Sequence, residues 1–255
     1  MNVTLIQSDL VWEEKKLNLQ AFEKQILDIT TASDLIILPE MFTTGFSMYP
    51  EKFAEEPNGL TFRKMQEWAK QKNSAITGSF IIKENNKYFN RAYFVFPDGS
   101  YRYYDKRHLF RMANEDKHYS SGQSRTIVEY KGWRILLQIC YDLRFPVWSR
   151  NNLNYDLAIY VANWPEVRST PWKMLLKARA IENLSYVAGV NRIGYDGNNM
   201  AHSGDSALID FKGEAICSIK AHSQESKTIL LDKQKLVQFR QKFPADRDAD
   251  KFIIN

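Results

Sequence analysis

The pattern of apolar and polar positions divides the chain into short strand-like segments and longer helix-like segments. Apolar residues that alternate with polar ones, or that follow one another in short runs, predict strands. These strands are expected at residues 3–7, 34–40, 74–82, 88–96, 101–106, 124–130, 133–140, 156–162, 185–191, 205–210, 214–219 and 228–231. Apolar residues three or four apart predict helices at 14–29, 60–72, 171–182 and 234–242.

The order of these segments predicts the fold class. A strand, a helix and a second strand over 3–40 imply a right-handed parallel crossover, whereas the closely spaced strands of 74–106 imply antiparallel hairpins. The chain has no Pro/Gly/Ser-rich linker, repeat or low-complexity run. We therefore predict an α/β fold with two mixed sheets, helices outside both, and a single domain over residues 1–255.

Composition excludes several classes of partner. The net charge of +5 is spread among interleaved acidic and basic residues, so we expect no nucleic-acid binding, which needs clustered cations. The chain has no long apolar run and its N-terminus does not resemble a signal peptide, so we expect no membrane partner. Two cysteines are too few for a disulfide framework, which indicates a cytoplasmic protein.

Cys140 stands at a predicted strand-to-helix junction. It is the last residue of the strand predicted from the apolar run that begins at Ile135. After it, Asp142 is suited to cap a helix, and Pro146 is tolerated in the first turn of a helix. Free backbone N–H groups at such a junction favour a thiolate and can bind an oxyanion. The alternative is that Cys140 is simply a small buried apolar residue.

Two further ionisable residues share this kind of position. Glu40 follows the apolar run 35–38, and Lys106 ends the strand 101–106. Strand ends line the clefts of α/β folds, and a carboxylate, an ammonium and a thiol together suit amide or nitrile cleavage. Glu40 could instead be an ordinary surface residue just past its strand. The loop 107–122 lacks periodicity, which is typical of a binding loop.

These residues lie in motifs that resemble those of the nitrilase, or carbon–nitrogen hydrolase, superfamily. The matching segments, in order, are Leu38-Pro-Glu40, Tyr104-Asp-Lys-Arg-His-Leu109, Cys140-Tyr-Asp-Leu-Arg-Phe-Pro146, Lys177-Ala-Arg-Ala-Ile-Glu-Asn183, Asn191 and Gly204-Asp-Ser-Ala-Leu-Ile-Asp210. The resemblance covers essentially the whole chain. It implies a nitrilase-type α-β-β-α sandwich, a homodimer, and a reaction that needs no metal or other cofactor.

The resemblance also implies a role for each matched residue. Glu40 would take the proton of Cys140, which would attack the amide carbon. Lys106 and the backbone N–H of Tyr141 would hold the oxyanion. Glu115, seven residues before Gly122 as in the family pattern, would orient Lys106 and the substrate; it could instead be a surface acid of the loop.

The segment after Cys140 resembles the bacterial ω-amidase branch of the superfamily. This implies release of ammonia from the terminal amide of 2-oxoglutaramate or 2-oxosuccinamate. Another small-amide hydrolase, such as a deaminated-glutathione amidase, is the alternative within the superfamily. A noncatalytic binding or scaffold protein is the alternative outside it, although a scaffold would not need all three reactive groups.

An anionic substrate of this kind requires a cation in the pocket. Arg111 is the first candidate because it lies in the same loop as Glu115; Arg144 and His118 are the others. Arg144 could instead pair with Asp142. Four residues could wall the pocket, although aromatic residues at strand ends are more often core: Phe42, Thr44, Trp164 and Tyr141.

Overall fold

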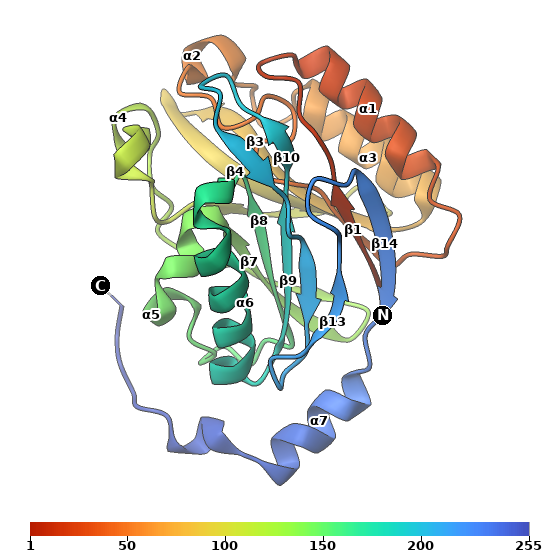
Figure 1. Ribbon diagram of the computed structural model, residues 1–255, viewed down its shortest axis with the longest axis vertical. Coiled ribbons are helices and arrows are strands. Elements are labelled where there is room, and N and C mark those ends of the chain that lie inside the picture. Colours follow the sequence, from red (N-terminus) through yellow and green to blue (C-terminus); the bar gives the residue numbers. More distant parts are fainter. Residues whose placement is uncertain (255) are drawn as a thin grey trace.

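The computed structural model, which describes residues 1–254, contains two six-stranded sheets and a separate hairpin (Figure 1). The first sheet has the order β14 (Glu225–Leu230), β1 (Asn2–Gln7), β2 (Leu35–Ile37), β3 (Ala75–Glu84), β4 (Lys87–Val95) and β5 (Tyr101–Asp105). The second has the order β13 (Ala215–Ser218), β12 (Ala207–Ile209), β9 (Tyr186–Asn191), β8 (Leu157–Ala162), β7 (Trp133–Ile139) and β6 (Ile127–Tyr130). The hairpin joins β10 (Ile193–Tyr195) to β11 (Ala201–Ser203).

Both large sheets are mixed and are built alike. Three central strands run parallel, β1, β2 and β3 in one sheet and β7, β8 and β9 in the other. Antiparallel strands complete both sides of each trio. The parallel trios place the carboxyl ends of several buried strands at one end of the molecule, where α/β folds form their clefts.

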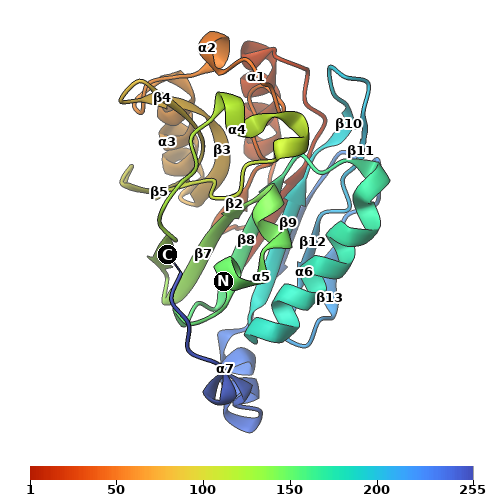
Figure 2. The same ribbon diagram turned by 90° about the vertical axis from the view of Figure 1, so that its left-hand side faces the viewer.

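Some helices cover the outer faces of the two sheets, and others lie beyond the ends of the strands. The longer ones are α1 (Lys15–Leu27), α3 (Leu60–Lys72), α6 (Ser169–Asn183) and α7 (Lys233–Lys242). The short ones are α2 (Pro50–Phe53), α4 (Glu115–His118), α5 (Pro146–Ser149) and the 3₁₀ turns η1 (Arg111–Ala113), η2 (Cys140–Arg144), η3 (Glu166–Arg168) and η4 (Ala245–Asp248). Helices α1 and α3 lie outside the first sheet, and α5 and α6 lie outside the second (Figures 1 and 2). The predicted α-β-β-α sandwich is confirmed.

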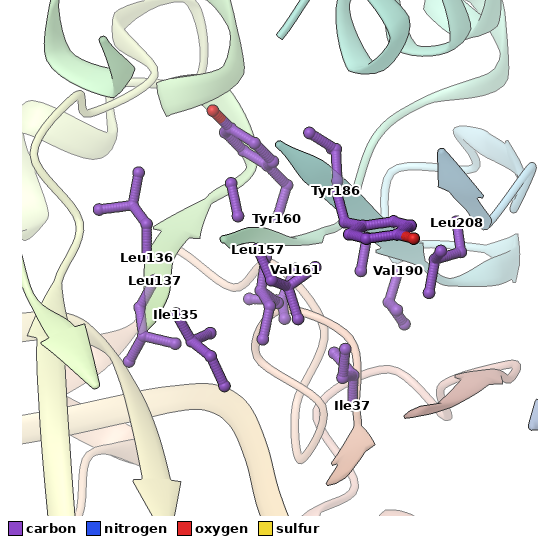
Figure 3. Close-up of a cluster of buried hydrophobic side chains, with 14 of the residues drawn as sticks. Ile37, Ile135, Leu136, Leu137, Leu157, Tyr160, Val161, Tyr186, Val190 and Leu208 are labelled. Atoms are coloured by element: carbon purple, nitrogen blue, oxygen red, sulfur yellow. The ribbon is translucent and has the colours of Figure 1, made fainter. Parts of the chain in front are cut away.

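The main core lies between the two sheets. Ile135 and Leu137 of β7 and Val161 of β8 belong to the same buried cluster as Ile37 of β2, in the opposite sheet (Figure 3). A second cluster lies between the first sheet and α1 and α3, where Trp68 is fully buried. Because one core includes residues of both sheets, it supports the single-domain organisation, which stays a prediction.

Local differences from the predicted elements have simple causes. Helix α6 begins at Ser169, two residues before the expected start, so Pro171 lies in its first turn rather than at its first position. Strands β10 and β11 were not predicted, because each is only three residues long. Among residues 1–254, the structure contains no helix that combines the length and apolar character of a membrane span.

Candidate active site

Cys140 occupies a strained turn at the end of β7. Its φ angle of 45° lies in the left-handed region, which side-chain-bearing residues rarely adopt. The 3₁₀ turn η2 follows the strand and begins at Cys140. We expected a helix capped by Asp142 here, and this was wrong, because Asp142 lies inside η2. Helix α5 starts only at Pro146, with Phe145 as its N-cap. Only 9% of the Cys140 residue is exposed.

The buried Asp142 side chain stabilises this turn through hydrogen bonds. Its carboxylate accepts hydrogen bonds from the backbone N–H of Ile139 (3.0 Å) and from the Tyr104 hydroxyl (2.8 Å). It also accepts the backbone N–H of His108 at 3.0 Å, and the His108 Nδ1 lies at 2.8 Å. Tyr104 and His108 flank Lys106 in the sequence, so one buried carboxylate connects the cysteine turn with the end of β5.

A buried charge cluster, formed by Glu40, Lys106 and Glu115, lies beside Cys140. The Lys106 Nζ lies 2.9 Å from Glu40 Oε1 and 3.0 Å from both Glu115 oxygens, and all three side chains have no exposed surface. Glu40 leaves the turn after β2, Lys106 follows β5, and Glu115 begins α4. Glu40 and Lys106 therefore converge as the strand-end argument predicted, and Glu115 joins them from α4, a position that only the family resemblance had indicated.

The polar atoms of this cluster are held by neutral partners as well as by each other. Asn90 Nδ2 donates to Glu40 Oε1 at 2.7 Å, and the backbone N–H of Asn163 donates to Glu40 Oε2 at 2.7 Å. The backbone N–H of Phe110 donates to Glu115 Oε2. Buried charges are tolerated only with such pairing, so the surrounding hydrogen bonds fix each carboxylate in one orientation.

The surroundings shift the pKa values of these groups in opposing ways. Burial alone would lower the pKa of Lys106, but the charges of Glu115 and Glu40 outweigh burial and hold that pKa above its ordinary value. Burial raises the pKa of Glu115, partly offset by Lys106. Burial, reinforced by the charge of Glu40, raises the pKa of the Cys140 thiol well above its ordinary value. At neutral pH the sulfur therefore carries a proton that a base must remove before attack.

A cavity of about 440 Å³ opens onto Cys140 and Lys106. Its walls come from the loops that follow the central strands and from the β10–β11 hairpin. Residues with aromatic rings dominate the lining: Trp12, Phe46, Tyr49, Phe110, Tyr141, Trp164 and His202. Such an apolar cavity with a few convergent polar groups is the usual form of a small-molecule site.

The cavity includes some of the predicted substrate-binding residues and excludes others. Tyr141, Arg144 and Trp164 line it. Arg144 does not pair with Asp142, whose oxygens are occupied; its guanidinium lies 5.1 Å from the centre of the Trp164 ring instead. Of the cations considered from the sequence, Arg144 alone faces the cavity.

Four of the expected pocket residues lie elsewhere, and this corrects the prediction. Phe42 is core: its ring packs edge-on against Phe22 at 5.3 Å. Thr44 is fully buried and donates to the carbonyl of Gly45. The Arg111 side chain is 87% exposed, with Asp116 at 3.8 Å, and His118 is also exposed. Loop membership alone did not reveal that α4 turns Glu115 inward and its neighbours outward.

Several site residues were missed. Asn163 could have been found, because it ends the buried strand β8 just as the reactive residues end theirs. Asn90 lies inside β4, where a buried amide has no distinct pattern. Arg168 and His202 come from η3 and β11, short elements with no periodic signal. Burial lowers the pKa of His202 to about 4, so this cavity residue is neutral at neutral pH.

Comparison with known proteins tests the interpretation of this geometry. The family model described as carbon-nitrogen hydrolase matches residues 2–241. The chain belongs to the carbon-nitrogen hydrolase family.

Individual members of the carbon-nitrogen hydrolase family are similar over most or all of the chain. The chain is 48% identical to Omega-amidase YafV of Escherichia coli (strain K12), covering all of this chain and 98% of that protein. It is 30% identical to 2-oxoglutaramate amidase of Bacillus subtilis (strain 168), over 84% of each chain. The crystal structure of XC1258 from Xanthomonas campestris, a CN-hydrolase superfamily protein with an arsenic adduct in the active site, superposes with a TM-score of 0.97 at 42% identity, covering 100% of this chain and 99% of that one.

Proposed function

We propose that this carbon-nitrogen hydrolase is an ω-amidase. It hydrolyses the terminal amide of small 2-oxo acid amides, such as 2-oxoglutaramate and 2-oxosuccinamate, to the oxo-diacid and ammonia. The observation that carries the proposal is the arrangement of three groups: Lys106 and Cys140 line one cavity, and the buried Glu40 carboxylate lies against both of them. The similarity to relatives named for this activity supports the choice of substrate.

The first half-reaction forms a thioester. Glu40 accepts the Cys140 proton as the sulfur attacks the amide carbon. The developing oxyanion is stabilised by the Lys106 ammonium and the backbone N–H of Tyr141, and one such donor contributes about 3–4 kcal/mol to the transition state. As the tetrahedral adduct collapses, Glu40 returns the proton to the departing nitrogen, which leaves as ammonia.

The second half-reaction restores the enzyme. Glu40 removes a proton from a water molecule, which attacks the thioester carbon, and the same oxyanion donors stabilise the second adduct. Collapse releases the carboxylic acid product, and the Cys140 sulfur recovers its proton. Glu115 does not touch the reacting atoms in this scheme; its two contacts with Lys106 position the ammonium.

Lys106 is well suited to act as a fixed charge rather than as a proton carrier. Its pKa is raised by the two carboxylates, so it remains an ammonium throughout the pH range of the reaction. A Phe46 ring lies 4.8 Å from its Nζ, which limits its access to water. A charge held in a dry site stabilises an oxyanion better than one that water can screen.

The carboxylate at the other end of the substrate requires a cation. We assign this role to Arg144, because it lines the cavity and follows the nucleophile by a single 3₁₀ turn. Its guanidinium lies over the Trp164 ring, which leaves its N–H edges free to donate to a carboxylate. Tyr141 and Trp164 complete the wall beside it.

Ammonia release from a panel of amides tests the proposed activity. The panel contains 2-oxoglutaramate, 2-oxosuccinamate, glutamine, asparagine, deaminated glutathione and simple nitriles. Preferred turnover of the two oxo-amides supports the proposal, and turnover of nitriles alone contradicts it. A cavity of about 440 Å³ also has room for a larger amide, so preferred turnover of deaminated glutathione would favour the second candidate, a deaminated-glutathione amidase.

We also propose that the protein is a homodimer. Apolar side chains with more than half of their surface exposed occur on α5, on α6 and just after α7, as at Val147, Ile181 and Phe243. Contact with a second copy at these positions would remove their apolar surface from water. Light scattering coupled to gel filtration distinguishes the dimer from a monomer.

Finally, we propose a cytoplasmic location. Both cysteines are free, and Cys140 must remain reduced to act as the nucleophile. Fractionation of cells that express the protein, followed by activity measurement in each fraction, tests this location. Activity in an extracellular fraction would contradict it.

A further inference from the structure

A second arginine faces the cavity that contains Cys140. Arg168 ends the short turn η3 and lines the cavity together with Arg144. The two come from different loops, one following β7 and the other following β8. The sequence motifs that identify the reactive residues do not include Arg168.

Neither guanidinium has a carboxylate partner within 4.0 Å among residues 1–254, whereas four other arginines with little exposed surface do, namely Arg91, Arg179, Arg192 and Arg240. Each instead lies over an aromatic ring: Arg144 over Trp164 at 5.1 Å and Arg168 over Phe110 at 5.4 Å. Stacking holds the plane of a guanidinium while leaving its N–H edges available. Two such groups in one cavity are typical of an anion site.

One tryptophan fixes the position of both arginines. The Arg144 guanidinium lies over the Trp164 indole ring. The Nε1 of the same indole donates a hydrogen bond to the Arg168 backbone carbonyl at 2.7 Å. The Trp164 backbone N–H donates to Asn191 Oδ1 at 2.7 Å, which anchors the loop to β9. These bonds use the backbone of Arg168, so they do not depend on its side chain.

The cavity contains one other charged side chain of opposite sign. Asp196 lies in the loop between β10 and β11 and also lines the cavity. Its Oδ1 accepts the backbone N–H groups of Asn198 (2.8 Å) and Met200 (2.9 Å), which shape that loop. Asp196 therefore has backbone hydrogen-bond donors of its own.

We propose that Arg168 is a specificity-determining residue that binds the substrate carboxylate together with Arg144. This inference rests on the proposed function, and it adds a second binding residue. A carboxylate has enough lone pairs to accept hydrogen bonds from two guanidinium groups. Two arginines in the cavity therefore favour binding of an amide that carries a carboxylate at its other end over a neutral amide of equal length. Arg168 acts in binding and takes no part in the proton transfers at Cys140.

Three amides of equal chain length test the role of Arg168: 2-oxoglutaramate, glutaramate, which lacks the oxo group, and pentanamide, which lacks the carboxylate too. In Arg168→Met the KM for both acids should rise about 10- to 100-fold with kcat nearly unchanged, the effect of losing a hydrogen bond to a charged group. The ratio of kcat/KM for glutaramate to that for pentanamide should fall by the same factor. Arg168→Lys, which keeps the positive charge, should restore part of this ratio.

Arg111→Met is the matched control, because Arg111 is an exposed arginine outside the cavity; it should leave every ratio unchanged. An equal loss on pentanamide in Arg168→Met, or no loss on either acid, would overturn the proposal. Circular dichroism and melting of the variant establish that it is folded. If the wild-type enzyme hydrolyses no oxo-amide, the proposed function fails, and the affinity of Arg168→Met for 2-oxoglutarate, measured by calorimetry against wild type, still decides the role of Arg168.

Discussion

Two charged regions of the site differ in how their charges are paired. One is the buried charge cluster, and the other is the arginine wall, the part of the cavity lining formed by Arg144 and Arg168. In the cluster, Lys106 is ion-paired with both Glu40 and Glu115, and none of the three side chains has exposed surface. In the wall, Arg144 and Arg168 lie over aromatic rings without carboxylate partners among residues 1–254. The charges of the cluster are paired within the protein, whereas the two arginines are left to pair with the carboxylate of the substrate.

This difference reflects what each region must do. A group that acts on reacting atoms works best when it is held rigidly in a dry environment, so that nothing needs to reorganise during the reaction. A group that selects a substrate must leave part of its hydrogen-bonding capacity unused until binding. Changes in the cluster should therefore alter kcat and stability, and changes in the wall should alter KM.

The largest effect is expected at the nucleophile. Cys140→Ala removes the sulfur that forms the thioester, so kcat should fall by on the order of 10⁴-fold or more. Ammonia release under substrate saturation measures it, and mass spectrometry of an acid-quenched reaction should detect the acyl adduct only with the wild-type enzyme. Full activity in this variant would rule out the covalent mechanism.

Glu40→Gln should separate catalysis from architecture within the cluster. Glutamine keeps the size of the side chain and can still accept from Asn90, but it cannot take a proton. We expect kcat to fall roughly 10²- to 10⁴-fold, the usual contribution of a general base. A variant that instead raised KM alone would show that Glu40 belongs with the wall.

Lys106→Met tests the cost of an incomplete cluster. It leaves Glu40 and Glu115 buried without their cation, and breaking a buried ion pair costs about 3–5 kcal/mol. Urea unfolding should show a loss of this size. Lys64→Met, at an exposed ion pair, is the control and should change stability by less than about 1 kcal/mol. Similar losses in both variants would contradict the distinction.

Arg144→Met should show the opposite signature from the cluster variants. We expect KM for 2-oxoglutaramate to rise about 10- to 100-fold, since a hydrogen bond to a charged group is lost. The free energy of unfolding should change by less than about 1 kcal/mol, because no carboxylate is left unpaired. A stability loss as large as that of Lys106→Met would mean that the arginine supports the fold.

The pH dependence of the thiol gives the smallest signal. Because the pKa of Cys140 is raised, the native thiol keeps its proton where an unfolded one ionises, near pH 9. The native state then binds more protons than the unfolded state, so this group's contribution to stability is lost as pH rises above about 9. The stability difference between wild type and Cys140→Ser should decline there. Thiolate absorbance at neutral pH would contradict the assignment.

The sequence allowed the reactive residues to be predicted, because they follow a rule that is local to each strand. Glu40 and Cys140 follow buried strands of the two parallel trios. Lys106 follows β5, which runs in the same direction as β3 because both are antiparallel to β4, so its end lies on the same side of the sheet. The same rule would have identified Asn163. Arg111 was predicted from its place in a loop, and loops have no period that says which side chains turn inward.

The sequence by itself determined the alternation of strands and helices and the sandwich that they form, because apolar residues at regular spacing must be buried together. It also indicated that Glu40, Lys106 and Cys140, which follow or end three of the strands, lie close together. Only the tertiary structure decided which cations face the substrate. That choice depends on a 3₁₀ turn, a hairpin and the stacking of arginines on Trp164 and Phe110, contacts between segments whose spacing carries no periodic signal.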